Sequence, residues 1–399
     1  MLERRTAVVS GAGPVGLALA LQLARAGIDV AVLELRDTVN LASKASTFHP
    51  ATLDLLDTLG VVPQMLAQGV RIDHVQYRAA SGEILARLGF DALKGRTAFP
   101  FRLHYEQIRL CGLLQDLLEA EPRAEIRFLS GVNAVSEDAD GVTVGYEHAG
   151  EAREIRADWL FGCDGGLSGV RSACGIGFEE KPYPGMVVRL YADQTLPEAL
   201  PGIDGITYIY DGDDSVSVLK MHDCWRIIVR VPEGVSAAEA LGDEWLIARL
   251  RHLLPVDEIM PRVVGRDTYS ARLRLSDAAT SGRRVFLAGD AVHLTNTRGG
   301  MNLNAGLQDA FALARAAIAS RQAGSLEPLA QAARKRERVA RDMLIPRTDQ
   351  NVKTGRARLA EIIDTAKDPA LLAGFLERQA MLDMLDGIAP ARTLTTAQA

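Results

Sequence analysis

The feature of this sequence that most constrains its fold is a glycine-rich turn at residues 11–16. The segment GAGPVG follows the apolar run TAVVS and precedes the apolar stretch LALALQLARAG. Gly11 permits a tight turn, Gly13 lets the backbone approach a pyrophosphate, and Gly16 allows a helix to pack closely on a sheet. The start of that helix offers free N–H groups to a phosphate. The pattern therefore predicts a strand, a phosphate-binding turn and a helix.

An acidic residue at the end of the next apolar run strengthens this interpretation. The run IDVAVLE ends at Glu34, whose carboxylate can accept hydrogen bonds from both ribose hydroxyls of an adenosine. A strand, helix and strand in this order are typical of a parallel, doubly wound sheet. The sequence thus predicts an α/β protein that binds a dinucleotide, and this motif alone leaves NAD and FAD both open.

Composition narrows the class of protein further. The chain has 399 residues, of which 48% are hydrophobic and 24% charged, and its net charge is −6. The acidic balance argues against binding to nucleic acid or to an acidic membrane. The four cysteines form no Cys-x-x-Cys pair and no histidine cluster completes a metal site, so we expect reduced thiols, no metal and a cytoplasmic location. Polar residues interrupt the apolar stretch 15–33, which argues against a membrane span.

The pattern of strands changes along the chain and predicts two domains. Residues 183–275 contain the runs MVVRLYAD, GITYIYDG, SVSVLKMH and WRIIVRVP, which are typical of a mixed or antiparallel sheet. We expect a Rossmann-like domain with a parallel sheet, in which two later motifs favour FAD binding over NAD binding, a second β-sheet domain that holds the substrate, and a helical segment at the carboxyl end. The expected boundaries are residues 1–74, 100–182 and 276–345 for the first, 75–99 and 183–275 for the second, and 346–399 for the helical segment.

Two later motifs distinguish FAD from NAD. CDGGLSGVR, residues 163–171, and GDAVHLTNTRGGMNLNAGLQDA, residues 289–310, each follow an apolar run. They place Asp164 and Asp290 at strand ends, where open α/β sheets bind their ligands. In the second motif two glycines precede a helix that we expect to begin near Asn304.

In these three motifs and in their order the sequence resembles the p-hydroxybenzoate hydroxylase-like family of single-component FAD-dependent aromatic monooxygenases, over about residues 5–345. The resemblance implies that Asp290 binds the ribityl and pyrophosphate part of FAD, and that Asp164 lies near the pyrophosphate and supports the use of NAD(P)H. It also implies a FAD contact by Gln107 and a position beside the adenosine for Arg36. The segment GGMNLN would pass the flavin ring, and the helix that follows would direct N–H groups at N1 and the C2 carbonyl.

The FAD contacts implied in this way come from all three motifs and from the segments between them. They are Gly11, Gly13, Pro14, Val15, Gly16, Glu34, Leu35, Arg36, Lys44, Ala45, Gln107, Asp164, Gly165, Asp290, Gly300, Met301, Asn302, Leu303 and Asn304.

The sequence departs from the family pattern at two places. Lys44-Ala45 stands where the family commonly has Arg-Ala in a mobile loop, and lysine lacks the bidentate fork of arginine. Asn296-Thr297 stands where two prolines are usual, on the substrate side of the flavin.

The candidates for substrate contact and catalysis lie mainly in the second domain. Tyr208, Tyr210, Lys220 and Thr297 are candidate substrate contacts. Arg226 resembles an arginine that the family places near the flavin, and His222 is a candidate base, although no catalytic residue is assigned. His293 is expected to be a structural, hydrogen-bonded residue.

The reaction implied by the resemblance is hydroxylation of an aromatic small molecule, whether phenolic, an aromatic acid or polyketide-like. NADPH or NADH reduces FAD, O2 adds to give a C4a-hydroperoxide, and one oxygen passes to the substrate. The alternatives are a FAD-dependent reductase or dehydrogenase of a polyprenyl or polyketide substrate, an NAD-dependent dehydrogenase, and a non-catalytic flavin-binding protein. The three isolated tryptophans argue against a halogenase. The chain is expected to be a monomer or a homodimer.

Overall fold

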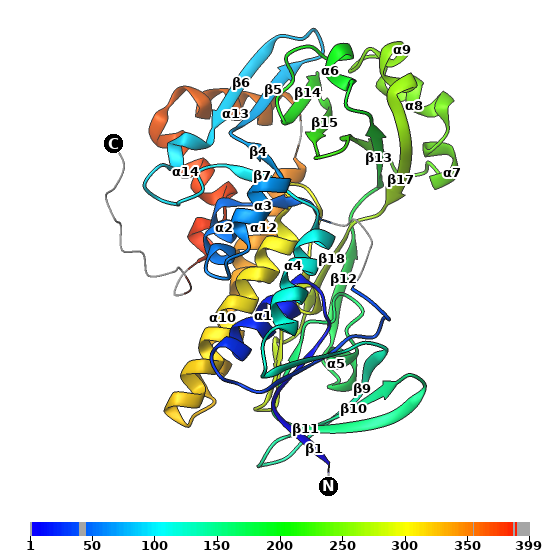
Figure 1. Ribbon diagram of the computed structural model, residues 1–399. Coiled ribbons are helices and arrows are strands. Elements are labelled where there is room, and N and C mark those ends of the chain that lie inside the picture. Colours follow the sequence, from blue (N-terminus) through cyan, green and yellow to red (C-terminus); the bar gives the residue numbers. More distant parts are fainter. Residues whose placement is uncertain (1, 40–44, 354, 386–387, 389–399) are drawn as a thin grey trace.

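The computed structural model describes residues 2–39, 45–353, 355–385 and 388 (Figure 1). An eight-stranded sheet lies at one end of the molecule and a seven-stranded sheet at the other, and the long helix α10 (Met301–Ala323) runs from the middle of the molecule toward the lower left (Figure 1). Lys44, one of the implied FAD contacts, lies outside the described residues.

The first sheet has the parallel centre that the glycine turn predicts. Its main path runs in the order β19-β20-β11-β1-β2-β8, and β1 pairs in parallel with both β2 and β11. The last four residues of β1 and all four of β2 are buried, since helices cover this sheet. The α/β fold with a Rossmann-like parallel sheet is therefore confirmed. The strands are β1 (Glu3–Ser10), β2 (Val30–Leu33), β8 (Ala124–Arg127), β9 (Ser130–Glu137), β10 (Val142–His148), β11 (Glu151–Gly162), β19 (Thr280–Ser281) and β20 (Val285–Leu287).

Helices α1 (Pro14–Arg25) and α10 pack side by side where the first and last motifs meet. Three residues make this contact close. A Cβ on Gly306 would lie 2.9 Å from Cγ2 of Val15 and 3.1 Å from the Cα of Gly289. Because these distances are shorter than ordinary van der Waals contact, glycine is required there. The glycine turn and the Gly-Asp motif, which begins at Gly289 and Asp290, are thus held against each other.

The second sheet is mixed and has two different faces. Its order is β17-β13-β16-β15-β14-β5-β6, with β14 and β5 parallel and the other pairs antiparallel. One face packs against α8 (Asp243–Leu250) and its neighbouring short helices, through residues such as Trp225, Ile227 and Leu246. The opposite face carries Tyr77 and Tyr208. The strands are β5 (His74–Ala79), β6 (Ile84–Gly89), β13 (Met186–Ala192), β14 (Ile206–Asp211), β15 (Asp214–Lys220), β16 (Trp225–Val231) and β17 (Val263–Tyr269).

Two small sheets lie between the large ones. The strands β3 (Thr47–Phe48), β7 (Arg102–His104) and β4 (Val70–Ile72) form the first, in the order β3-β7-β4. The strands β12 (Phe178–Pro182), β18 (Arg272–Ser276) and β21 (His293–Leu294) form the second and join the two halves of the molecule (Figure 1).

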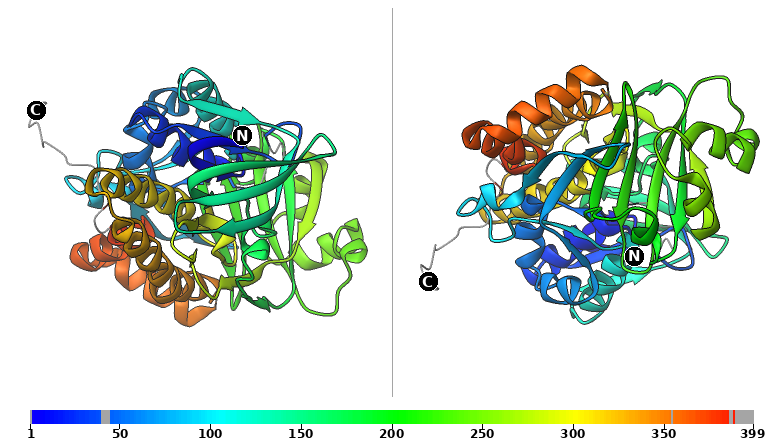
Figure 2. Two further views of the ribbon diagram at one scale, coloured as in Figure 1. Left: turned by 90° about the horizontal axis from the view of Figure 1, so that it is seen from below. Right: turned by 90° about the horizontal axis from the view of Figure 1, so that it is seen from above.

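The carboxyl-terminal part is helical, as expected, as far as it is described. Helix α13 packs against β6, and α14 packs against the short helix η1 (Phe90–Leu93). Figure 2 shows these helices on one side of the molecule and α8 on the other. The division into domains at the residues given above stays a prediction. The helices are α11 (Glu327–Val339), α12 (Ile345–Val352), α13 (Arg356–Lys367) and α14 (Pro369–Gln379).

Among the described residues, none of the helices combines the length and the apolar character that crossing a membrane requires.

Candidate active site

The glycine turn has the geometry of a phosphate-binding loop. Gly11 has φ +102°, a conformation that L side chains rarely adopt, and Gly13 caps the amino end of α1. A Cβ on Gly16 would lie 2.0 Å from the carbonyl oxygen of Gly11, so no side chain fits there. A Cβ on Gly13 would meet nothing within 4 Å, which leaves room for a ligand at the start of α1. Pro14 and Val15 form the first turn of that helix.

Glu34 joins the end of β2 to this turn. One carboxylate oxygen accepts a hydrogen bond from the N–H of Ala12 at 2.8 Å, and the other accepts from the N–H of Arg36 at 3.0 Å and from its guanidinium at 3.2 Å. The Glu34 side chain is only 7% exposed, whereas that of Arg36 is 53% exposed. The adjacent Leu35 is exposed and contacts Gly131. Glu34 therefore holds the glycine turn and retains lone pairs for ribose hydroxyls.

Asp164 lies beside the glycine turn at the end of β11. Its Oδ2 accepts hydrogen bonds from the hydroxyl of Ser10 at 3.3 Å and from the N–H of Val170 at 3.1 Å. Its Oδ1 is buried and has no hydrogen-bond partner among the described residues. The next residue, Gly165, has φ +81° and open space at its Cβ position. A buried carboxylate oxygen without a partner is costly, so this edge of the sheet fits a ligand that donates a hydrogen bond, as a ribose or ribityl hydroxyl does.

The Gly-Asp motif is held by a buried ionic network. Asp309, in α10, accepts hydrogen bonds from the N–H of Gly289 at 3.1 Å and from Nε2 of His293 at 2.7 Å. Its second oxygen accepts from Nε of Arg336 at 2.7 Å. Burial opposes ionisation of Asp309, but its charge interactions and hydrogen bonds with His293 and Arg336 outweigh burial and lower its pKa. His293 is thus the structural, hydrogen-bonded residue that was expected, and the network fixes the loop that presents the half-buried Asp290.

Helix α10 begins three residues earlier than predicted. Gly300 has φ +66° and caps the helix, so the first turn starts at Met301 rather than near Asn304. The cause is the left-handed conformation of Gly300, which sequence spacing alone does not reveal. The first four N–H groups of an α-helix have no partner within the helix. Here they belong to the segment Met301, Asn302, Leu303 and Asn304, which the resemblance places beside the flavin ring.

Two asparagine side chains of this segment brace the backbone. Asn304 is fully buried, donates to the carbonyls of Thr47 at 2.8 Å and Gly300 at 2.7 Å, and accepts from the N–H of His49 at 2.9 Å. Asn302 exchanges three hydrogen bonds with Thr295. Since these side chains are used within the protein, any contact with a flavin here is expected from the backbone.

Arg226 connects the second sheet to the segment before α4 (Gln107–Glu119). Its side chain is 5% exposed and donates to Oγ of Ser46 at 2.9 Å and to Glu106 at 2.8 Å. The N–H of Gln107 donates to the carbonyl of Ala45 at 3.0 Å. The structure therefore brings together Ala45, Gln107 and Arg226, three residues predicted from separate parts of the sequence.

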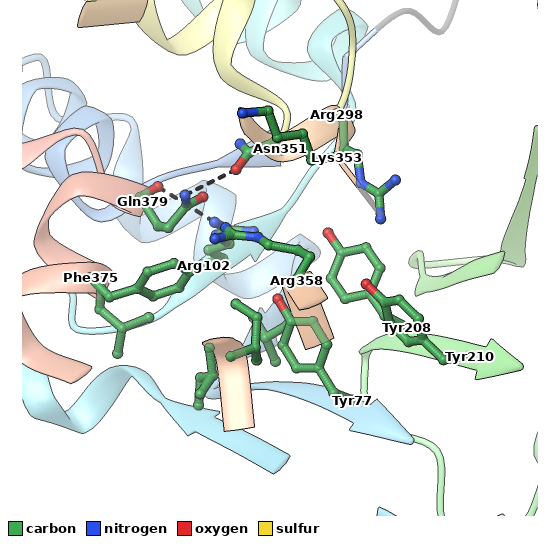
Figure 3. Close-up of a pocket in the computed structure, with 15 residues that line it drawn as sticks. Tyr77, Arg102, Tyr208, Tyr210, Arg298, Asn351, Lys353, Arg358, Phe375 and Gln379 are labelled. Carbon is green, nitrogen blue, oxygen red and sulfur yellow. Dashed lines mark hydrogen bonds between the residues drawn. The ribbon is translucent and has the colours of Figure 1, made fainter. Parts of the chain in front are cut away.

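A cavity lies between the second sheet, the loop before α10 and the carboxyl-terminal helices (Figure 3). Tyr208 and Tyr210, two of the predicted substrate contacts, line it and stack against Tyr77, with centroid separations of 5.1 Å and 6.3 Å. The remaining lining includes Arg102, Arg298, Gly299, Asn351, Arg358, Phe375 and Gln379.

Lys220 and His222 do not lie where the sequence suggested. Lys220 is exposed, and its ammonium lies 5.9 Å from the ring of Trp225, on the sheet face that α8 covers. Residues alternate between the faces of a strand, so Lys220 points away from Tyr208. His222 is exposed in the turn between β15 and β16 rather than on a strand. Neither residue lines the cavity described above, and their roles in substrate contact and as a base stay predictions.

Thr297 also departs from expectation. Thr297 is exposed and is not among the residues that line the cavity. Its hydroxyl forms a hydrogen bond with the hydroxyl of Tyr269, with 3.0 Å between the two oxygen atoms. Its neighbour Arg298 lines the cavity instead. No sequence pattern predicted that Arg102, Arg298 and Tyr77 would line this cavity; the one available signal was an arginine within the apolar run FRLHY, residues 101–105.

The fold, the glycine turn, and the acidic residues at three strand ends define a dinucleotide-binding oxidoreductase whose residues fit FAD. Residues 4–345 match the family model described as FAD binding domain, and the chain belongs to this family. It is a FAD-dependent monooxygenase of the p-hydroxybenzoate hydroxylase-like class, as its three motifs predicted.

Individual relatives agree with this assignment. The chain is 32% identical over 324 residues to a para-nitrophenol 4-monooxygenase of Pseudomonas sp. (strain WBC-3), covering 78% of this chain and 77% of the relative. It is 33% identical over 326 residues to a 12-dehydrotetracycline 5-monooxygenase/anhydrotetracycline 6-monooxygenase of Streptomyces rimosus, covering 78% of this chain and 62% of the relative. The crystal structure of p-nitrophenol 4-monooxygenase from Pseudomonas putida DLL-E4 superposes with a TM-score of 0.85 at 28% identity, covering 95% of this chain and 99% of that one.

Proposed function

We propose that this enzyme hydroxylates a phenolic, aromatic-acid or polyketide-like small molecule with NAD(P)H and O2, and that the cavity beside α10 holds the substrate. The observation that carries the proposal is the position of that cavity. Tyr208 and Tyr210 line one side, and Arg298 and Gly299, directly before the amino end of α10, line another. A planar aromatic molecule would stack well on tyrosine rings.

The residues of the first sheet have the donor and acceptor groups that FAD requires. Glu34 would accept hydrogen bonds from the adenosine ribose, and Asp164 and Asp290 would bind hydroxyl groups farther along the cofactor. The start of α1 would hold the pyrophosphate with its free N–H groups. The positive end of α10 would stabilise negative charge on the reduced ring. Bound FAD would supply the transfer of electrons from NAD(P)H and the activation of O2.

The second sheet and the carboxyl-terminal helices would exclude water from the reacting atoms. This matters because water in the site would release peroxide without hydroxylating the substrate. Arg226 would support this arrangement, since it ties the sheet to Ser46 and Glu106. A cytoplasmic location and a monomeric or homodimeric state remain predictions from the sequence.

The test is a screen of phenols, aromatic acids and quinone-like polyketides for stimulated NAD(P)H oxidation by the FAD-loaded enzyme under labelled O2. We expect at least one compound to stimulate oxidation and to gain one labelled oxygen atom. A product that is reduced and carries no label would favour the reductase alternative. Absence of both oxidation and labelled product across the screen would overturn the proposal.

A further inference from the structure

The substrate cavity has an uneven distribution of charge. Four cationic side chains line it, namely Arg102, Arg298, Lys353 and Arg358, and none of the lining residues is Asp or Glu. Tyr77, Tyr208 and Tyr210 form the neutral, aromatic side (Figure 3). Such a cavity presents a positive potential to anything that enters it.

Most of these cations have no acidic partner among the residues that the structure describes. Arg358 pairs with Glu361 at 2.6 Å, and that carboxylate is 59% exposed. Arg298 lies 5.5 Å from the centroid of Tyr208. Within the described parts of the chain, neither Arg102 nor Arg298 forms an ion pair with a carboxylate.

Arg102 is the most unusual of the four because it is buried. Only 5% of the residue is exposed, and burial lowers its pKa. Its guanidinium donates one long hydrogen bond, 3.4 Å, to the carbonyl of Gln379 and lies 5.4 Å from the centroid of Phe90, while Nε has no partner among the described residues. An isolated buried charge costs several kcal/mol, and an anion in the cavity would offset this cost.

We propose that the cationic end of the cavity binds an anionic oxygen substituent of the aromatic substrate, with Arg102 as the central residue. This inference rests on the proposed function and names the substrate class for it. A carboxylate matches the planar fork of a guanidinium, and an ionised phenol offers the same oxygen charge. The ring of the substrate would lie against Tyr77, Tyr208 and Tyr210.

The carboxyl-terminal helices supply part of the lining of this cavity. Arg358 comes from α13, and Phe375 and Gln379 come from α14. The side chain of Gln379 also donates a hydrogen bond to Asn351 of α12 at 3.1 Å, and the backbone carbonyl of Gln379 accepts the hydrogen bond from Arg102 (Figure 3). These helices therefore line the cationic end of the cavity and contribute to its specificity for substrate.

The test measures binding to the FAD-loaded enzyme through changes in the flavin absorbance spectrum. The first arm compares hydroxybenzoates, hydroxyphenylacetates and hydroxycinnamates with their neutral amides at one pH. The second arm compares 4-nitrophenol above and below its own pKa. In at least one arm we expect the anion to bind about 10- to 100-fold more tightly than its neutral counterpart.

Two variants test which residues cause the tighter binding of anions. Arg102→Met should remove most of the preference for the anion and leave affinity for the neutral partner nearly unchanged, and Arg298→Met should reduce the preference in part. Arg298 is only half-buried, so its variant stays informative if Arg102→Met folds poorly. Arg87→Met is the matched control, because Arg87 lies on β6, pairs with Asp204 on the surface and does not line the cavity.

The outcomes separate this inference from the proposed function. A preference for the carboxylates or for the phenolate supports the anion subsite if Arg102→Met removes most of it or if Arg298→Met reduces it. If the wild-type enzyme binds no anion more tightly than its neutral partner, or if both variants keep the preference, the inference is overturned. Hydroxylation of neutral phenols in that case would leave the proposed function intact.

Discussion

The carboxylate of Glu34 accepts a hydrogen bond from the N–H of Ala12 at 2.8 Å, inside the glycine turn. The acid that the sequence assigns to ribose binding therefore also holds the loop that would bind the pyrophosphate. A single side chain links two parts of the proposed cofactor site, and its removal should affect both.

Glu34→Ala should weaken FAD binding by about 10- to 100-fold, because it removes charge-assisted hydrogen bonds to the turn and to the ribose. Titration of the apoprotein with FAD, followed by flavin fluorescence, measures this change. Glu83→Gln, an exposed residue in the turn between β5 and β6, is the control and should bind FAD normally. An unchanged dissociation constant for Glu34→Ala would contradict the assignment.

Asp290→Ala should lose FAD during purification, with an affinity lower by about 10-fold or more, since the carboxylate would anchor the cofactor at the end of β20. The ratio of flavin absorbance to protein absorbance gives the content directly. Asp223→Ala, in the exposed turn between β15 and β16, should keep its FAD. Equal FAD content in the two variants would show that Asp290 has another role.

Asp309→Asn should lower the free energy of unfolding by about 3–5 kcal/mol, because Arg336 would be left buried without its anionic partner. Urea denaturation of the FAD-loaded protein measures the loss. Asp342→Asn removes an exposed carboxylate from the segment after α11 and should change the stability little. Equal stability of the two variants would mean that the network around Asp309 does not support the fold.

The stability of the protein should fall as the pH is lowered from 7 to 5. Burial lowers the pKa of His104 from 6.5 to about 4, and its Nδ1–H donates to the carbonyl of Lys220 at 2.6 Å. Between these two values the unfolded chain binds a proton that the folded protein excludes, so the free energy of unfolding decreases by about 1.4 kcal/mol per pH unit for this residue. Burial shifts the pKa of His49 in the same direction.

His104→Asn isolates this contribution, since an amide can donate to the same carbonyl without titrating. Its free energy of unfolding, measured at saturating FAD, should depend on pH less steeply than that of the wild type. The same slope for both proteins would show that His104 does not set the pH dependence.

The candidate residues of the cofactor site could be named from the sequence because they lie in short segments at strand ends. The order of strand, glycine turn, helix and acid fixed the positions of Gly11, Gly16 and Glu34, and the structure places Asp164 beside them at 3.3 Å from Ser10. The start of α10 was misplaced by three residues, since the positive φ of Gly300 leaves no clear mark on hydrophobic periodicity. Lys220, a candidate substrate contact, lies on the face of the second sheet away from Tyr208, and the register of that sheet, which local spacing does not reveal, sets this orientation.

The glycine turn and the two later motifs determined by themselves the fold class, the cofactor and the family, because each is a local pattern with its own backbone requirement. The cavity that we propose for the substrate was decided only by the tertiary structure. Arg102, Arg298 and Arg358 lie far apart in the sequence and meet only when β7, the loop before α10 and helix α13 pack together. These three positive charges are brought together by packing, so no local pattern in the sequence predicts that they line one cavity.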